Sequence, residues 1–421
     1  MFRENLVKDF FKRGIKFKGI ERELKILKIN KVISIVGPRR AGKTWYFYYL
    51  FQKVKKPMYI SFEDIAFRYI EASEFFEVLK VFSEINYTPK TLFLDEIQNL
   101  KDWSTLVRSL YDRGFNIFLT GSSSKLLPKE ISTELRGRTL TYRLLPFSFR
   151  EFLRAKKYKA KPEIFEKKGE LLKLLNEYLE FGGFPEVVLS ETKEKILQEY
   201  SNEIFYRDFV ERHKIRSLEF GRFLFEFCFQ NFSKEISFKK IKNYFDKRVS
   251  DTTLYEYVEK LQDTLCVFFL EKHEKSIYLR KSWPKKIYVC DLGLSSILGF
   301  GENLGKRMEN VVFLELLRKT NESPLMEIFY FKTKEDYEID FLVKEGPRVK
   351  ELIQVSYANS FDEIDHREIR ALLHARDVFK KDKPKLLVIT WDYEDEKQVS
   401  WFGKRGEIRF VPLWMWLLKL K

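Results

Sequence analysis

The sequence predicts an α/β fold in which a parallel sheet carries a phosphate-binding loop. The first observation is KVISIVGPRRAGKT at 31–44, an apolar β-branched run followed by the pattern G-x-x-x-x-G-K-[ST]. The second is TLFLDE at 91–96, an apolar run that ends in paired carboxylates. The third is NIFLTGSSS at 116–124, an apolar run that ends in small polar residues. Further strands are expected at 58–62 and 139–145, with helical stretches between the strands.

The loop at 37–44 has the composition of a phosphate cradle. Gly37 and Gly42 let the backbone curl with its N–H groups inward, and the helix that opens at Lys43 adds free N–H groups and the positive end of its dipole. Lys43 is expected to reach the β and γ phosphates of ATP, and Thr44 to offer a hydroxyl to Mg²⁺. The alternative is a glycine turn beside a solvated lysine. The residues expected to contact the nucleotide are Gly37, Pro38, Arg39, Arg40, Ala41, Gly42, Lys43 and Thr44.

Asp95 and Glu96 supply the second half of such a site. Two adjacent carboxylates at the end of a buried strand need a cation or strong hydrogen bonds, because burying them otherwise costs free energy. Asp95 is expected to hold the hydration shell of Mg²⁺ together with Thr44, and Glu96 to orient and deprotonate the attacking water. An ordinary exposed strand end is the alternative interpretation.

Polar residues after the strand at 116–119 and arginines before the last strand complete the candidate site. Thr120 or Ser122 is expected to lie near the γ phosphate and to sense it. Arg136 and Arg138 are candidates to stabilise the transition state at that phosphate, within one chain or from a neighbouring subunit. The second case predicts a homo-oligomer, whereas surface arginines are the alternative.

Composition limits the class of protein. At 421 residues the chain predicts two to four domains, and 44% hydrophobic with 33% charged residues fits a folded chain. Three widely spaced cysteines indicate neither a zinc site nor a disulfide framework. The absence of a long apolar run predicts a cytoplasmic protein without a membrane partner. A net charge of +16 favours an anionic partner such as double-stranded DNA, although a thermophile surface with 78 basic and 62 acidic residues is the alternative.

Five segments resemble one known family: GPRRAGKT, LFLDE, LTGSSSKLL, ELRGRTLTYRLLPFSFREFL and EFGGFPEVV. Together they are similar to the archaeal and bacterial AAA+-like ATPases of the additional-strand P-loop class. The resemblance implies ATP and Mg²⁺ as ligands. It also implies that the sensor strand lies between the P-loop strand and the acidic strand, so that Lys43, Thr44, Asp95, Glu96 and Thr120 converge.

The chain after the P-loop domain, 1–150, divides into three expected regions. Charged helices at 151–217 correspond to a helical lid in the resembling family. The stretch 218–285 resembles a winged helix-turn-helix, with strands expected at 266–270 and 277–279. Its capped helix carries acidic residues, while its lysines lie on the preceding segment, so a protein-docking module is as good an interpretation as a DNA reader.

The last region, 286–421, resembles a restriction-endonuclease-like α/β domain. Relatives hold a metal with a helix glutamate, a strand aspartate and a Glu-x-Lys motif. Glu309 and Asp340 match the first two, but the third place reads Gln354-Val355-Ser356. Glutamine lacks the charge to hold a divalent ion tightly, and serine cannot replace the lysine, so we predict that nuclease chemistry is lost.

These observations favour a Mg²⁺-dependent ATPase whose cycle drives a conformational change on DNA. Three alternatives stay open. They are an ATP-gated protein-interaction switch with negligible turnover, a nuclease with an altered metal site, and an ATP-dependent protein-interaction module that binds no nucleic acid.

Overall fold

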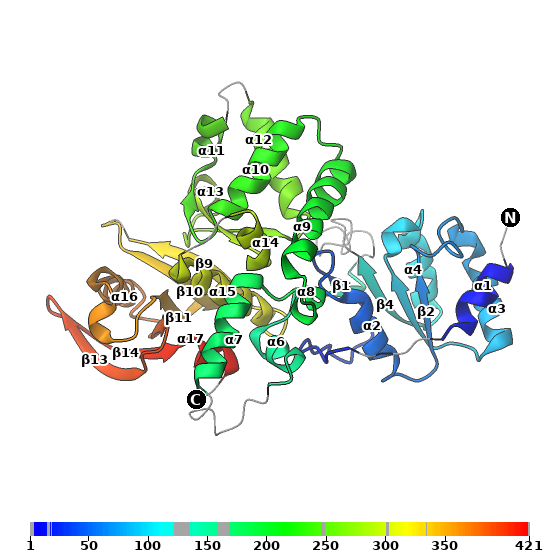
Figure 1. The fold of residues 1–421 in the computed structure, drawn as a ribbon, viewed down its shortest axis with the longest axis horizontal. Coiled ribbons are helices and arrows are strands. Elements are labelled where there is room, and N and C mark those ends of the chain that lie inside the picture. Colours follow the sequence, from blue (N-terminus) through cyan, green and yellow to red (C-terminus); the bar gives the residue numbers. More distant parts are fainter. Residues whose placement is uncertain are drawn as a thin grey trace. The chain divides into compact units, whose positions relative to one another are not determined.

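A computed structural model describes residues 4–14, 17, 19–121, 135, 137–158, 168–245, 249–299, 303–333 and 335–419. The chain forms two compact units, Met1–Leu145 and Pro146–Lys421, and the peptide bond between Leu145 and Pro146 connects them. Figure 1 colours the first unit in blue and cyan and the second from green to red. Our finer domain boundaries stay predictions.

Unit 1 is built on a five-stranded sheet with the order β2-β3-β4-β1-β5, in which every pairing is parallel. The strand that ends near Thr120 lies between the P-loop strand and the acidic strand, as the resemblance implied. The bounds are β1 Val32–Val36, β2 Pro57–Ser61, β3 Thr91–Asp95, β4 Asn116–Gly121 and β5 Thr139–Arg143. Because all five strands are parallel, their carboxyl ends share one edge, which is where the candidate residues lie.

Helices and an aromatic core support this sheet. Phe47 of the helix after the P-loop packs on Phe93 of the acidic strand, with ring centroids 5.2 Å apart. Both side chains are fully buried, so the helix that starts at Lys43 is fixed against the strand that delivers Asp95. The bounds are α1 Glu4–Lys12, α2 Lys43–Phe51, α3 Phe75–Ile85, α4 Trp103–Asp112, and short 3₁₀ turns at Ala72–Glu74 and Ile97–Asn99.

Unit 2 begins with helices. Ser148 caps the first of them, because its side chain accepts from the Glu151 amide at 3.2 Å while the Glu151 carboxylate accepts from the Ser148 amide at 2.9 Å. A turn at Gly182-Gly183 follows the second helix, and Pro185 opens the third. The bounds are α6 Phe149–Ala155, α7 Lys168–Phe181, α8 Pro185–Leu189 and α9 Lys193–Glu203, which continues as a π-helix over Ile204–Glu211.

A small sheet of order β6-β8-β7 and the helices α10 to α13 follow. The expected strand at 277–279 is wrong, because Ile277–Ser282 forms helix α13, and β7 pairs instead with β8 through Val267 and Val289. The apolar run at 277–279 has the composition of a strand, but its residues are exposed, whereas those of β8 are mostly buried. The bounds are α10 Leu218–Gln230, β6 Glu235–Ile236, α11 Phe238–Phe245, α12 Asp251–Gln262, β7 Val267–Leu270 and β8 Lys285–Val289.

The C-terminal part of unit 2 holds a six-stranded sheet of order β13-β14-β12-β11-β10-β9. The sequence predicts strands at 328–331, 339–343, 352–355 and 386–390 and a helix at 306–319, and all of them are present. The hairpin β13–β14 adds two strands at one edge. The strands are β9 Met326–Lys332, β10 Glu338–Glu345, β11 Arg348–Val355, β12 Lys385–Thr390, β13 Asp395–Trp401 and β14 Lys404–Pro412. The helices are α14 Leu292–Ile297, α15 Leu304–Lys319, α16 His366–Val378 and α17 Leu413–Leu418, with a 3₁₀ turn at Phe361–Glu363. Within the described ranges, no helix combines the length and apolar character needed to cross a membrane.

Candidate functional site

The P-loop connects β1 to α2 in unit 1. Gly42 adopts the left-handed conformation, with φ of 92°, immediately before the helix. Gly37 has no room for a side chain, because a Cβ there would lie 2.0 Å from the carbonyl oxygen of Leu144. Lys43 is buried, and its ammonium reaches back along the loop to donate to the carbonyls of Gly37 at 3.1 Å and Pro38 at 3.0 Å. The backbone conformation at Gly42 and the close approach at Gly37 therefore favour glycine at both positions. The Lys43 ammonium lies over the loop that we predict to bind phosphate.

The carboxylate of Asp95 is the centre of a hydroxyl cluster. Thr44 donates to Asp95 Oδ2 at 2.7 Å, and Thr120 donates to Oδ1. The Thr120 hydroxyl also accepts from the Glu96 amide at 3.1 Å. The structure therefore brings together Thr44, Asp95, Glu96 and Thr120, each of which the sequence analysis had singled out.

Burial sets the protonation behaviour of this cluster. Burial, followed by repulsion from Glu96, raises the pKa of Asp95, whereas hydrogen bonds from Thr120 and Thr44 act in the opposite direction. Glu96 adopts a left-handed backbone with φ of 51°, which is uncommon for a residue with a side chain and concentrates at functional sites. The Gln98 amide donates to its carboxylate. A cation beside Asp95 would favour the charged form that burial disfavours.

The residues around Asp95 fit a magnesium ion. A threonine hydroxyl and a carboxylate are oxygen ligands that Mg²⁺ prefers, and the two are already 2.7 Å apart. When bound with ATP, the ion would neutralise phosphate charge, and Thr44 and Asp95 are the residues that would hold it.

Three residues near the site escaped the sequence analysis. Tyr59 on β2 donates its hydroxyl to Asp95 Oδ2 at 2.8 Å. Glu63 follows the same strand, and Glu96 and Asp95 contribute, after burial, to the raised pKa of its carboxyl. Arg22 donates to carbonyls in the P-loop and at the end of the unit. Tyr59 and Glu63 had a signal that could have been used, because β2 neighbours β3 and its last residues reach the same edge.

The two arginine candidates do not join this group. Arg138 precedes β5 and its carbonyl accepts from the amide of Val32, at the amino end of β1, whereas the P-loop follows the carboxyl end of that strand. Its guanidinium pairs with Asp112 at 3.3 Å. A role for Arg138 at the phosphates of its own chain is therefore wrong, and a role in a neighbouring subunit stays a prediction. Arg136 and Ser122 lie outside the described residues.

A second cluster of ionisable groups lies in unit 2, at the positions matched to the nuclease motif. Glu309 on α15 and Asp340 on β10 do converge, but the ammonium of Lys286 lies between them, 3.0 Å from Glu309 Oε1 and 2.8 Å from Asp340 Oδ1. The Glu338 carboxylate is 2.7 Å from the same ammonium. Gln354 accepts from the Asp340 amide at 3.1 Å. The Gln354 side chain therefore hydrogen-bonds to the backbone of β10 and not to the ammonium of Lys286.

This arrangement does not fit a divalent metal ion. The ammonium of Lys286 already contacts the carboxylates that would be the ligands, and its side chain is 3% exposed. Burial lowers the pKa of Lys286, but Asp340 and Glu309 outweigh it and hold the pKa well above its usual value. Burial raises the pKa of Glu309 to about 7, against the opposing effect of Lys286. Among the described residues, no group of three or more histidine, cysteine or acidic side chains is arranged to hold a metal.

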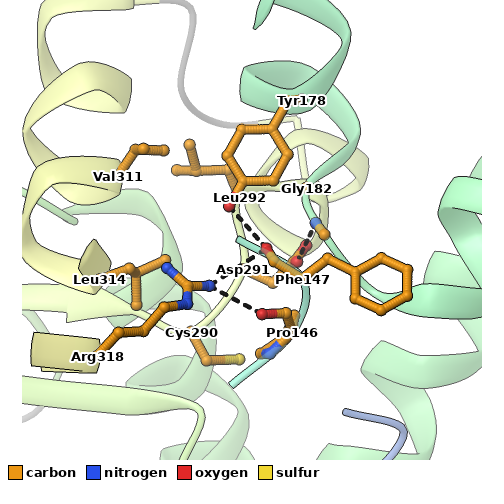
Figure 2. Close-up of a pocket in the computed structure, with 11 residues that line it drawn as sticks. Pro146, Phe147, Tyr178, Gly182, Cys290, Asp291, Leu292, Val311, Leu314 and Arg318 are labelled. Atoms are coloured by element: carbon orange, nitrogen blue, oxygen red, sulfur yellow. Dashed lines mark hydrogen bonds between the residues drawn. The ribbon is translucent and has the colours of Figure 1, made fainter. Parts of the chain in front are cut away.

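A small pocket in unit 2 surrounds the Gly182-Gly183 turn (Figure 2). Asp291 accepts from the amides of Gly183 at 2.7 Å and Gly293 at 2.9 Å, and burial raises the pKa of its carboxyl to about 7. A Cβ at Gly182 would lie 1.9 Å from Asp291 Oδ1. The EFGGFPEVV segment of the sequence therefore builds a turn that packs on a buried carboxylate.

Family comparisons agree with the division seen in the structure. Residues 29–153 match the AAA domain family. Residues 172–304 and 304–408 match two domains of unknown function, DUF8612 and DUF4143.

Solved structures and curated proteins provide further relatives. Walker-type ATPase paby2304 of Pyrococcus abyssi has a TM-score of 0.42 at 13% identity, covering 71% of this chain and 96% of that chain. Cdc6p from Pyrobaculum aerophilum has a TM-score of 0.26 at 12% identity, covering 74% and 93%. An uncharacterized protein of Haemophilus influenzae is 28% identical over 403 residues, 91% of this chain and 94% of that protein.

A fourth relative is similar along almost the whole chain. Uncharacterized protein MJ1544 of Methanocaldococcus jannaschii is 41% identical over 432 residues, which covers 99% of this chain and 95% of that protein. The chain described here belongs to the same family as this protein, with an AAA domain in its N-terminal part.

Proposed function

We propose that this protein binds ATP with Mg²⁺ in unit 1 and hydrolyses it. The observation that supports this best is the convergence of Lys43, Thr44, Asp95 and Thr120 at one edge of a parallel sheet. Lys43 at the end of the glycine loop and Asp95 at the end of a neighbouring strand are both buried, and burying such charged groups costs free energy that a bound ligand would offset. The match to the AAA domain points the same way.

Each residue has a defined task in this proposal. Lys43 leaves its carbonyl partners to bind the β and γ phosphates, and the amides of the loop and of the first turn of α2 bind the remaining oxygens. Glu96 accepts the proton of the attacking water, while Thr120 orients the Glu96 amide and contacts the γ phosphate. The hydroxyl of Tyr59 holds Asp95 in its orientation.

Steady-state ATP hydrolysis tests the proposal, with Lys43→Ala as the blank. Turnover that requires Mg²⁺ and disappears in the blank is the expected result. Hydrolysis equal in both proteins would contradict it. Tight ATP binding without turnover would favour the alternative in which the nucleotide acts as a switch.

We further propose that unit 2 contacts double-stranded DNA through the region of α11. The order α10, β6, α11, α12, β7, α13, β8 with the sheet order β6-β8-β7 supports this proposal, because it resembles a winged helix in which α13 lies between the last two strands. Lys239 and Lys240 on α11 are exposed, whereas α12 presents acidic residues, so α11 is the element that can approach phosphates. Lys247 and Arg248 lie outside the described residues.

Charge reversal with a matched control tests the DNA contact. Lys239→Glu with Lys240→Glu is expected to weaken duplex binding and to lower the slope of log affinity against log salt by about 2. The control is Lys380→Glu with Lys381→Glu, which makes the same charge change at exposed positions of unit 2. Equal losses in both variants would indicate that net charge alone attracts DNA. No salt-sensitive binding by the unmodified protein would favour a protein-docking module.

We also propose that active sites are shared between subunits of a homo-oligomer, with Arg138 facing a neighbouring P-loop. Its place at the far edge of its own sheet supports this, since it cannot serve its own site. Mixing Lys43→Ala with Arg138→Ala is expected to restore part of the turnover. Mixtures that never exceed the separate proteins would contradict sharing.

A further inference from the structure

Arg22 lies in the irregular segment before the sheet, and its guanidinium joins two carbonyl groups that are far apart in the sequence. Nη1 donates to the carbonyl of Ala41, inside the P-loop, at 2.7 Å. Nη2 donates to the carbonyl of Leu145, the last residue of unit 1, at 2.5 Å. Arg22 is only 8% exposed, so water competes little for these charge-assisted bonds. One side chain therefore bridges the nucleotide loop and the point where the chain leaves unit 1.

The bond to Ala41 also orients the amide that follows it. Across a trans peptide, the carbonyl of one residue and the N–H of the next point in opposite directions, and the described chain contains no cis peptide. Arg22 therefore directs the Gly42 N–H away from the guanidinium. This N–H is one of the loop donors that we assign to phosphate. A phosphate that accepts from the Gly42 N–H and the Arg22 guanidinium that donates to the Ala41 carbonyl would therefore hold the same peptide from opposite sides.

The exit segment touches the loop at a second point. The amide of Leu144 donates to the carbonyl of Val36 at 2.8 Å, just before the P-loop begins. The carbonyl of Leu144 then fills the space that a side chain at Gly37 would need. Leu144 therefore lies against the start of the loop through both its amide and its carbonyl, while Arg22 holds the carbonyl of Leu145.

Across the connecting peptide bond, another arginine holds the next two carbonyls. Arg318 on α15 donates to the carbonyl of Pro146 at 2.8 Å and to that of Phe147 at 3.2 Å, and Figure 2 shows its guanidinium directed at both residues. The Phe147 carbonyl also accepts from the Tyr178 hydroxyl at 2.8 Å. Arg318 and Tyr178 therefore hold the first two residues of unit 2, which follow Leu145 directly in the chain.

We propose that Arg22 is a positioning residue that couples phosphate occupancy of the P-loop to the 144–147 segment, a regulation of the site that rests on the proposed ATP-binding function. Phosphate adds a bond on the side of the Ala41–Gly42 peptide opposite Arg22 and so restrains this peptide further, and Arg22 passes the added restraint to Leu145. Without phosphate the two Arg22 bonds remain, but the peptide lacks the second restraint.

Amide hydrogen exchange of the full chain with and without Mg·ATP tests this coupling. In the unmodified protein, nucleotide is expected to slow exchange both in peptides that span 37–44 and in peptides that span 140–147. Arg22→Lys can satisfy only one of the two carbonyls, so nucleotide should still slow exchange at 37–44 but not at 140–147, with ATP affinity lowered by about 5-fold. Arg108→Lys, on the exposed face of α4, is the control and should behave like the unmodified protein.

The outcomes separate the coupling from the function beneath it. Nucleotide-dependent slowing at 140–147 that survives Arg22→Lys overturns the coupling and leaves ATP binding intact, as does slowing confined to 37–44 in the unmodified protein. No slowing at 37–44 in the unmodified protein overturns the proposed function and the coupling with it. Exchange of β3 without nucleotide reports folding, with Arg22→Gln as a second variant. If both variants lose protection of β3, Arg22 is a structural residue and the coupling is wrong.

Discussion

Two of the buried lysines, one in each unit, have different surroundings. Lys43 in unit 1 donates to the carbonyls of Gly37 and Pro38, and its charge also acts, against the larger effect of burial, to lower the pKa of Glu63. Lys286 in unit 2 contacts the carboxylates of Glu309, Glu338 and Asp340, all within 3.0 Å. Both side chains are less than a tenth exposed.

This difference indicates which cluster can take a ligand. The charge of Lys286 is compensated where it lies, so an added anion or cation would have to break buried ion pairs first. The carbonyls that hold Lys43 give up little when a phosphate replaces them, because a charge-assisted bond to phosphate is stronger than a bond to a neutral acceptor. This comparison supports our proposal that Lys43 belongs to a binding site and Lys286 to a structural cluster.

The largest expected effect that would break this comparison is on stability. Lys286→Met leaves three carboxylates near one another without their cation and should lower the free energy of unfolding by about 3–5 kcal/mol. Lys43→Met removes an ammonium from carbonyl dipoles and should change it by less than about 1 kcal/mol. Denaturant unfolding of both variants measures the difference. Equal losses would show that the two lysines are structural alike.

A smaller effect concerns the acid beside each lysine. Glu96 is expected to act as a base, so Glu96→Gln should lower ATP turnover about 100-fold, or about 2.7 kcal/mol, with nucleotide affinity nearly unchanged. Glu309→Gln serves as the matched change in unit 2 and should leave turnover as it is. Turnover and equilibrium nucleotide binding of the two variants check this. Full activity in Glu96→Gln would remove Glu96 from the mechanism.

The pH dependence of stability sharpens the comparison further. Burial raises the pKa of Glu309 to about 7, above the unfolded value of 4.5, so the folded state binds more protons between these pH values. The free energy of unfolding should therefore fall as pH rises from about 4.5 to 7, by roughly 3 kcal/mol from this group. Glu309→Gln should flatten that part of the profile. An unchanged slope in the variant would assign the dependence to another group, such as Asp291.

The smallest expected effect is that of a divalent metal on unit 2. Millimolar Mn²⁺ without nucleotide should not stabilise the Lys43→Met protein, and no Mn²⁺-dependent plasmid cleavage should occur, because the ammonium of Lys286 occupies the acidic cluster. A saturable rise in melting temperature that disappears in Asp340→Ala, together with cleavage, would establish the nuclease alternative.

The strand order and the candidate site of unit 1 could be predicted because the site residues lie in a few short, contiguous sequence segments. The P-loop, the Asp95-Glu96 pair and Thr120 each end a strand, and a parallel sheet brings strand ends together whatever the loops between them do. The place of Tyr59 at this edge could have been expected, because its strand neighbours the acidic strand. Arg22 could not be assigned a role, because its bonds depend on how an irregular segment packs. Such contacts follow from tertiary structure and have no local pattern.

Unit 2 was harder to predict for a related reason. Glu309 and Asp340 were correctly matched to one cluster. Lys286 was placed at the start of the same region, 286–421, but without a role, and its strand β8 pairs in the small sheet instead. The strand KKIYV begins with two lysines, and nothing in its local pattern distinguishes the buried Lys286 from the partly exposed Lys285. The short run at 277–279 gave the opposite error, since apolar residues on an exposed turn of helix look like a strand.

The most direct test of the central claim is thermal unfolding of three proteins with and without Mg·ATP. The unmodified protein should be stabilised by nucleotide. Lys43→Met should unfold at the same temperature as the unmodified protein without nucleotide, and nucleotide should not raise that temperature. Lys286→Met should unfold at a lower temperature, but nucleotide should still raise its unfolding temperature. A nucleotide-dependent rise in unfolding temperature that persists in Lys43→Met, or that is lost in Lys286→Met, would contradict the assignment of the ligand site to unit 1 and of the structural cluster around Lys286 to unit 2.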